Sequence, residues 1–285
     1  SFHWGTYRVE VHNNEVVALH PFEEDPDPSS IGQGYVSVLN GPDRITAPMV
    51  RKSWLEGGPG SRPDLRGVDP FVEVSWGTAN KLVAEELERV RSVHGNSSIF
   101  GGSYGWASAG RFHHAQSQLH RFLNCIGGYT KSKFTYSFAA AEAMVPHILG
   151  SFREHLDSCT SWESVSENCE LFVALGGTPL KNGQISQGGT GNHIQRNSLF
   201  KAHESGVKFV NVSPLRSDID DRIDADWISL RPSTDTAFLL ALAHTLIVEN
   251  LVDLPFVNKY TVGFEEFSKY LMGSDDNTPK SARWA

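Results

Sequence analysis

The apolar and polar positions at the start of the chain alternate, which is typical of β-strands. Residues 6–11 place three large side chains on one face, and residues 16–20 repeat the alternation. Asn13 and Asn14 lie between these segments, and asparagine tolerates the left-handed backbone that a tight hairpin turn requires. The sequence therefore predicts a β-hairpin near the N-terminus.

Beyond residue 80 the apolar positions recur with the longer period of helices. Residues 80–93 form one apolar helical face, with Glu85 and Arg89 one turn apart and Gly95 as a stop signal. Similar patterns predict helices over residues 110–123, 138–155, 194–203 and 235–249, the last capped by Ser233 or Thr234. Continuous apolar runs between them predict buried strands over residues 98–102, 171–175, 207–212 and 227–230.

Strands that are apolar on both faces and alternate with helices indicate a mainly parallel, doubly wound sheet. We therefore expect an α/β fold in which a small β-rich domain, residues 1–68, precedes an α/β dinucleotide-binding domain, residues 69–285, that is incomplete at its C-terminal end. The Gly- and Pro-rich residues 57–67 are the most linker-like segment. Residues 23–28 are acidic and contain prolines, which predicts an exposed loop.

Ligands of such sheets bind beyond the carboxyl ends of the strands. Three loops at predicted strand ends, residues 101–106, 176–182 and 213–218, combine glycines with polar side chains. Glycine lets the backbone approach a ligand closely, and lysine, arginine and backbone N–H groups suit phosphates. These loops favour a dinucleotide-like ligand, although ordinary strand-to-helix turns would look similar. They match neither the nicotinamide fingerprint nor the Walker A loop.

Composition narrows the functional classes. The chain of 285 residues has 33 Asp and Glu against 25 Lys and Arg, a formal net charge of −8. This acidic balance disfavours binding to nucleic acid or to an anionic membrane, and no apolar run approaches the ~20 residues of a membrane span. Cys125, Cys159 and Cys169 lack the spacing of a zinc or iron–sulfur site. Each reads as a small buried hydrophobe, and Cys159 with Cys169 could form a disulfide.

Other catalytic arrangements find little support. His113 and His120 share one face of a predicted helix, but no carboxylate is spaced with them for zinc, and no G-x-S-x-G elbow is present. Tyr104 and Trp106 stand out, because they place two aromatic rings with polar groups in a Gly-rich loop. Buried, these groups would need hydrogen-bond partners; local core packing is the alternative interpretation.

At this loop the sequence resembles a known family. Residues 101–130 (GGSYGWASAGRFHHAQSQLHRFLNCIGGYT) and 135–150 (TYSFAAAEAMVPHILG) resemble the molybdopterin enzymes of the dimethyl sulfoxide reductase family, in particular its single-subunit S/N-oxide reductases. The resemblance continues in order through most of the chain, with HWG at 3–5, APMVR at 47–51, FVEVSW at 71–76, TSW at 160–162, RPSTD at 231–235 and ALAHTL at 241–246.

The resemblance implies roles for individual residues. Ser137 falls where the family carries the serine that ligates molybdenum, and a hard alkoxide suits a high-valent metal. Tyr104 and Trp106 match a pair whose O–H and N–H groups face the transferred oxygen, so that Tyr104, Trp106 and Ser137 are the implied catalytic residues. The tyrosine, which trimethylamine N-oxide reductases lack, favours sulfoxides. The implied cofactor contacts are Tyr136, Lys181, Asn182, Ser213, Pro214, Arg216 and Asp235.

The sequence departs from the family in three respects. Thr135 stands where most relatives carry an aspartate, which leaves the hydrogen bonding around Ser137 open. Gly77 and Thr78 replace an acidic pair at a helix start, although Thr78 can still cap that helix. Family members are more than twice as long, so the resemblance covers only their first two domains, and the remaining domains of the enzyme are expected partners.

The implied function is a molybdenum-dependent transfer of an oxygen atom from a sulfoxide (biotin sulfoxide, methionine sulfoxide or dimethyl sulfoxide) or an N-oxide. The implied cofactor is molybdenum with bis(molybdopterin guanine dinucleotide), without an iron–sulfur cluster, and an electron donor is required. An alternative is a non-catalytic fragment or subunit that binds part of the cofactor or a partner chain. A nicotinamide-dependent oxidoreductase is disfavoured by the absent fingerprint. The sequence leaves a cytoplasmic or periplasmic compartment open.

Overall fold

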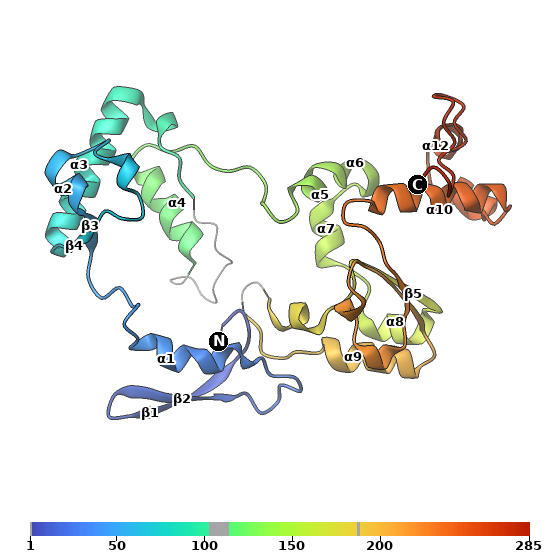
Figure 1. Ribbon diagram of the computed structural model, residues 1–285, viewed down its shortest axis with the longest axis horizontal. Coiled ribbons are helices and arrows are strands. Elements are labelled where there is room, and N and C mark those ends of the chain that lie inside the picture. The colour runs from blue at the N-terminus through green and yellow to red at the C-terminus, as the bar shows by residue number, and fades with distance from the viewer. Residues whose placement is uncertain (1, 103–113, 187–188) are drawn as a thin grey trace. The chain divides into compact units, whose positions relative to one another are not determined.

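Helices and small sheets alternate along the chain, so the α/β class is confirmed at this level (Figure 1). The computed structural model describes residues 2–102, 114–186 and 189–285. These residues form two units, one of residues 1–161 with 181–197 and one of residues 162–180 with 198–285. No helix among the described residues is long and apolar enough to cross a membrane. The boundary at residue 68 and the doubly wound arrangement stay predictions.

The first unit opens with the predicted hairpin. Strands β1 (Tyr7–His12) and β2 (Glu15–Pro21) pair antiparallel, and the register shifts once, between Glu10 and Val11. Asn13 and Asn14 both have positive φ, 50° and 64°, as the two central residues of a type I′ turn require. The hairpin is therefore confirmed, together with the reason for its turn. The short helix α1 (Tyr35–Leu39) follows it.

A second antiparallel pair joins β3 (Met49–Arg51) to β4 (Phe71–Glu73), with helix α2 (Lys52–Gly57) between them. The Gly- and Pro-rich residues 57–67 therefore connect two strands that pair with each other. Asp69, at the end of this connection, is buried. Its carboxylate accepts hydrogen bonds from the Ser53 hydroxyl at 2.5 Å and from Arg51 Nε at 2.9 Å.

Helix α3 (Trp76–His94) confirms the predicted amphipathic helix and starts earlier than expected. The Ser75 hydroxyl accepts from the Thr78 N–H at 3.1 Å, so that Ser75 is the cap where Thr78 was expected. The helix ends at Gly95, whose φ of +79° favours glycine. Arg89 pairs with Glu86, 2.6 Å away, instead of with Glu85 as predicted.

Helix α4 (Ala115–Cys125) and helices α5 (Ala139–Met144), α6 (Pro146–Leu149) and α7 (Phe152–Asp157) complete the first unit.

Three predictions for the first unit are corrected by the structure. The helix expected over residues 138–155 is broken into three, because Pro146 starts a new helix and Gly150 has a φ of +85°. The strand expected over residues 98–102 is reduced to one parallel bridge, between Phe100 and Thr130. Residues 23–28 include the buried Asp25 and are not simply an exposed loop.

The second unit is built on a parallel sheet. Strands β5 (Leu171–Leu175), β6 (Lys208–Val212) and β7 (Asp226–Ile228) lie in the order β5-β6-β7. They pair in parallel, as the alternating pattern predicted. Helices α8 (Trp162–Asn168) and α9 (Gln195–Glu204) pack on it. The rest of this unit is helical: α10 (Asp235–Val248), α11 (Leu254–Tyr260) and α12 (Phe264–Leu271).

The core of this unit lies between one face of the sheet and these two helices. Leu199 and Ala202 of α9 are fully buried against Phe209 of β6. The other face of β5 differs from the prediction of a strand buried on both faces, because about half of the surface of Leu171, Val173 and Leu175 is exposed. The described part of the unit therefore covers one face of β5 more fully than the other.

Candidate functional site

A polar pocket in the first unit contains one of the predicted site residues. Its volume is about 260 Å³ and its walls include Gly101, Gly102, His120, Lys131 and Tyr136. Gly102 is followed by residues 103–113, so the predicted residues Tyr104 and Trp106, and also His113, lie outside the described residues. The pocket thus brings Tyr136, which precedes the predicted ligand Ser137, close to Gly102, the last described residue before Tyr104 and Trp106 in the sequence.

The turn of Thr135, Tyr136 and Ser137 is fixed by hydrogen bonds to the helix that follows it. The Thr135 N–H donates to a carboxylate oxygen of Glu142 at 2.8 Å, and the Thr135 hydroxyl accepts from the Phe138 N–H at 3.3 Å. A threonine hydroxyl in this position makes the bond that an aspartate carboxylate can also make. The substitution of Thr135 for aspartate therefore keeps a hydrogen-bond acceptor at the helix start.

Tyr136 and Ser137 are both exposed in this turn. Two basic groups contribute to the nearby pocket, namely Lys131 and His120, whose ring stacks on Tyr129 with centroids 5.3 Å apart. In the described parts of the chain, no three His, Cys, Asp or Glu side chains cluster as metal ligands would. The exposed Ser137 oxygen, next in the chain to the pocket residue Tyr136, is a hard ligand of the kind that suits a high-valent metal.

In the second unit, the loops that follow β5 and β6 meet at the carboxyl edge of the sheet. The Thr178 N–H donates to the Asp218 carbonyl at 2.7 Å, and the Asp218 carboxylate accepts a short hydrogen bond from the Ser213 hydroxyl. Gly177 has a φ of +78°, and a Cβ at this position would lie 2.4 Å from the Asp218 Cβ. The glycine is therefore needed for the two loops to approach, as the strand-end argument anticipated.

Ser213 is almost completely buried, and its polar groups are bonded within the unit. Besides its hydroxyl, its N–H donates to the Ile228 carbonyl at 3.1 Å, and its carbonyl accepts from the Trp227 indole N–H at 2.9 Å. Asn211, also buried, donates from its amide to the carbonyls of Leu215 and Arg216. These bonds fix the backbone of the loop, so Ser213 shapes the site and does not present its hydroxyl to solvent.

The other predicted residues of the second unit are exposed. Pro214 and Arg216 lie on the loop that Ser213 and Asn211 hold, and Asp235 is the first residue of α10. A guanidinium at the carboxyl end of a parallel strand fits the phosphate of a nucleotide. Lys181 and Asn182 belong to the first unit, where they share the 3₁₀ turn Leu180–Gln184 and are both exposed.

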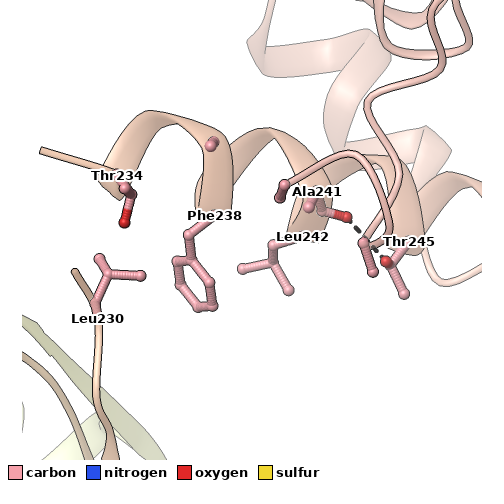
Figure 2. A pocket seen from close by; sticks show the side chains of 9 residues that line it. Leu230, Thr234, Phe238, Ala241, Leu242 and Thr245 are labelled. Carbon is pink, nitrogen blue, oxygen red and sulfur yellow. Dashed lines mark hydrogen bonds between the residues drawn. The ribbon is translucent and has the colours of Figure 1, made fainter.

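The second unit also has a groove whose lining differs in chemistry from these loops. This groove of about 350 Å³ runs along α10, and Figure 2 shows Leu230, Phe238 and Leu242 facing it. The Thr245 hydroxyl donates to the Ala241 carbonyl of its own helix at 2.8 Å. The lining is mainly apolar, so this groove does not suit a phosphate or a metal.

Sequence reasoning missed four residues near the predicted sites. Lys131 carried no motif, and Asn211 could have been noticed as the one amide inside the apolar strand VKFVNV. Asp25 and His193 form a buried pair that adjoins the turn of Lys181 and Asn182, with His193 Nδ1 2.6 Å from an Asp25 carboxylate oxygen. They are 168 residues apart, and no local pattern marks them. The three cysteines are free thiols, so the disulfide considered for Cys159 and Cys169 is not formed.

The loops at the carboxyl edge of this parallel sheet lie where α/β proteins commonly bind their ligands. The comparisons with known proteins make this specific. Residues 44–264 match the family described as molybdopterin oxidoreductase, and residues 3–39 match the N-terminal domain of molybdopterin oxidoreductases. The chain belongs to the molybdopterin oxidoreductase family.

Several curated relatives are similar over nearly the whole chain. A dimethyl sulfoxide/trimethylamine N-oxide reductase of Cereibacter sphaeroides is 40% identical over 99% of this chain and 34% of its own length. A biotin sulfoxide reductase of the same organism is 39% identical over 94% and 36%, and a trimethylamine-N-oxide reductase of Haemophilus influenzae is 37% identical over 99% and 34%. The chain thus spans about a third of the length of these relatives.

Proposed function

We propose that the protein containing this chain is a molybdenum-dependent reductase that removes an oxygen atom from a sulfoxide or an N-oxide. The observation that carries the proposal is the turn of Thr135 to Ser137, which exposes a serine beside a polar pocket at the start of the loop of Tyr104 and Trp106. The names of the relatives, which are reductases of such substrates, support the same reaction class.

When bound, the molybdenum cofactor supplies the two-electron redox chemistry by which the substrate loses its oxygen. The protein side chains have separate tasks. The Ser137 oxygen would hold the metal, and the hydrogen-bonded turn around it sets where that oxygen lies. The Tyr104 hydroxyl and the Trp106 indole N–H donate to the transferred oxygen, where negative charge gathers. The presence of Tyr104 favours a sulfoxide as the substrate.

The form of the cofactor is part of the proposal. We infer two molybdopterin guanine dinucleotides, with Tyr136, Lys181, Asn182, Ser213, Pro214, Arg216 and Asp235 among the contacts of one of them. Arg216 and Lys181 are exposed cations suited to phosphate, and Asp235 can accept from the amide groups of a guanine. The only cysteines of the chain are three free thiols at 125, 159 and 169, which favours a site without an iron–sulfur cluster.

The fold that we propose for the complete site is a doubly wound sheet preceded by a small β-rich domain, with the boundary near residue 68. The order of the parallel strands β5, β6 and β7 supports it, and so do the half-exposed apolar side chains of β5, which a second layer would cover. The remaining domains of the enzyme would complete the fold, and a separate electron donor would supply the electrons.

Metal and nucleotide analysis of the protein as its gene encodes it tests this function. We expect molybdenum, and guanine nucleotide released by acid, together with reduction of a sulfoxide or N-oxide by a dithionite-reduced dye. A protein that is folded and stable but contains neither molybdenum nor guanine nucleotide would contradict the proposal. That outcome would favour a non-catalytic binding role instead.

A further inference from the structure

A buried carboxylate and a buried imidazole join distant parts of the first unit. Asp25 and His193 expose 7% and 3% of their surface, and His193 Nδ1 lies 2.6 Å from one oxygen of the Asp25 carboxylate. The other oxygen accepts from the backbone N–H of His193 at 3.0 Å and from that of Asp27 at 3.2 Å. The carboxylate is therefore fully hydrogen-bonded, as a buried charge must be.

These bonds also explain the ionisation of Asp25. Burial raises the pKa of the Asp25 carboxyl, but the hydrogen bonds from the His193 backbone and ring and from Asp27 outweigh it, so that the pKa is below its ordinary value. The charge of Asp25 also acts on Tyr7. Burial raises the pKa of the Tyr7 hydroxyl, and the negative charge of Asp25 adds to the rise.

The far side of the imidazole ring contacts the backbone of the turn that carries the predicted nucleotide contacts. His193 Nε2 lies 3.0 Å from the carbonyl oxygen of Gln184, the last residue of the turn Leu180–Gln184. A carbonyl oxygen can only accept, so this contact is a hydrogen bond when Nε2 carries a proton. The ring connects Asp25 on one side to this turn on the other.

Further bonds attach the same segment to the N-terminal residues. The Gln184 side chain donates to the Asp27 carbonyl at 3.2 Å, and Arg196 Nε lies 3.0 Å from the Asp27 carboxylate. The Ser186 N–H donates to the His3 carbonyl at 2.7 Å. These contacts hold residues 184–196 to residues 3–27, whereas Lys181 and Asn182 at the exposed end of the turn depend on Gln184 for their position.

We propose that His193 is a positioning residue for the turn that carries Lys181 and Asn182. Its ring holds the Gln184 carbonyl in place, and Asp25 holds the ring. The turn is thereby kept in one shape, so that a nucleotide meets prearranged contacts and does not have to order them on binding. This inference rests on the proposed function for the role of Lys181 and Asn182, whereas the positioning itself is a property of the protein alone.

Two substitutions of His193 separate its two bonds. His193→Asn keeps an amide donor near the position of Nδ1, facing Asp25, and loses the bond to Gln184. His193→Gln extends its amide to the position of Nε2, facing Gln184, and loses the bond to Asp25. A purely structural role predicts that His193→Gln is the more damaging everywhere, because it leaves a buried carboxylate without its partner. The positioning role predicts the opposite at residues 181–186, namely that His193→Asn disturbs this segment more than His193→Gln does.

Hydrogen exchange followed by mass spectrometry, performed on the protein as its gene encodes it, measures that order. We expect His193→Asn to accelerate amide exchange in residues 181–186 by about 10-fold, and to lower the retained guanine nucleotide by a similar factor, which is the low end for loss of an outer-shell partner. His193→Gln should restore most of the slow exchange in this segment. The proposal would be overturned if exchange in residues 181–186 were faster in whichever of the two variants is less stable overall, and not specifically in His193→Asn.

Asp69→Asn is the matched control. Asp69 is a buried carboxylate of the same unit whose pKa the Ser53 hydroxyl lowers more strongly than burial raises it, and its partners are Ser53 and Arg51. We expect this variant to be less stable overall without faster exchange in residues 181–186. Equal acceleration in Asp69→Asn and His193→Asn would contradict a specific role of His193.

The unsubstituted protein provides a test that does not depend on folding of the variants. Nitrogen NMR of labelled histidine should show a proton on Nε2 of His193, the atom that faces the Gln184 carbonyl, and a bare Nε2 would overturn the proposal. If the protein contains no molybdenum and no guanine nucleotide, the proposed function fails. The exchange comparison still decides whether His193 positions residues 181–186, so the two failures are distinguishable.

Discussion

Ser137 and Ser213 were both predicted as site residues, and the structure gives them opposite surroundings. Ser137 is exposed in a turn fixed by its neighbour Thr135, whereas Ser213 is 1% exposed and bonded to Asp218, Ile228 and Trp227. A side chain that is already bonded within the fold acts on a ligand through the backbone that it shapes. An exposed side chain in a rigid turn can meet the ligand itself.

This difference makes the two serines experimentally separable. Replacing Ser137 should affect chemistry more than stability, because the residue is exposed. Replacing Ser213 should affect stability first, because the Asp218 carboxylate would lose its hydroxyl donor in a buried place. The predictions below test this separation, from the largest expected effect to the smallest.

Ser137→Ala carries the largest expected effect. Loss of an outer-shell partner costs a metal site up to about 100-fold in activity, and loss of a ligand should cost more. We therefore expect reduction of the sulfoxide or N-oxide to fall by at least about 100-fold. The free energy of unfolding should change by less than about 0.5 kcal/mol, as is usual for exposed positions. Steady-state kinetics and urea denaturation measure the two quantities.

Ser132→Ala is the control for this prediction, because Ser132 is an exposed serine that lines the same pocket. We expect its activity and stability to stay close to those of the unsubstituted protein. Full turnover in Ser137→Ala would remove this residue from the mechanism. A large loss of stability would show instead that the turn depends on its hydroxyl.

Ser213→Ala should lower the free energy of unfolding by about 1–3 kcal/mol, because it leaves the Asp218 carboxylate short of a donor in a buried corner. Urea denaturation of the second unit measures this loss. Ser217→Ala, an exposed serine of the same loop, is the control and should be close to neutral. An unchanged stability in Ser213→Ala would mean that this bond contributes nothing, and would remove the contrast with Ser137.

The sequence allowed the two serines to be chosen but not to be distinguished. Local features were predictable, because the Asn13–Asn14 turn and the stop at Gly95 depend on nearby residues. The surroundings of Ser213 depend on Trp227, which belongs to another strand. Burial that is set by such tertiary contacts leaves no periodic signal.

The same limit explains the predictions that were wrong. Asp25 was placed in an exposed loop because its neighbours are acidic and prolines flank it, yet its partner His193 lies 168 residues further along the chain. Leu171, Val173 and Leu175 form an apolar run typical of a fully buried strand, but only the face of β5 toward Phe172 has a core to join. The sequence pattern shows which side chains are suited to burial, whereas the tertiary fold determines which of them are buried.

Ser53 and Asp69 form a serine–aspartate hydrogen bond like that of Ser213 and Asp218 in the second unit. This bond in the first unit makes stability depend on pH. The Ser53 hydroxyl and N–H and the Arg51 guanidinium lower the pKa of the Asp69 carboxyl more than burial raises it. A carboxyl whose pKa is lower in the folded than in the unfolded protein adds stability above about pH 4, its ordinary range, and loses this stability as the pH falls through the folded value.

Ser53→Ala should therefore flatten the fall in stability below about pH 4 and lower the stability at neutral pH. Urea denaturation between pH 7 and pH 3 measures both changes. Ser61→Ala, a serine on the connection between the two paired strands, bonds only to the nearby Gly58 carbonyl and is the control. Parallel pH profiles for Ser53→Ala and the unsubstituted protein would show that the hydroxyl does not set this pKa.

The smallest expected effect concerns Thr135 and tests whether the turn of Ser137 depends on the kind of acceptor at this position. The Thr135 hydroxyl already accepts from the Phe138 N–H, so Thr135→Asp should keep this bond. The added charge would lie close to Glu142, whose carboxylate accepts from the Thr135 N–H, and this repulsion offsets the stronger acceptor. We expect stability to change by less than about 0.5 kcal/mol and turnover to change little.

Thr135→Val is the matched variant, because it keeps the shape of threonine and removes the acceptor. It should lose about 0.5–1.5 kcal/mol, as loss of one intramolecular hydrogen bond does. Its turnover should fall more than that of Thr135→Asp, because the position of the Ser137 oxygen depends on this turn. If Thr135→Val and Thr135→Asp were equally active, the rigidity of the turn would be irrelevant to Ser137, and exposure alone would explain its difference from Ser213.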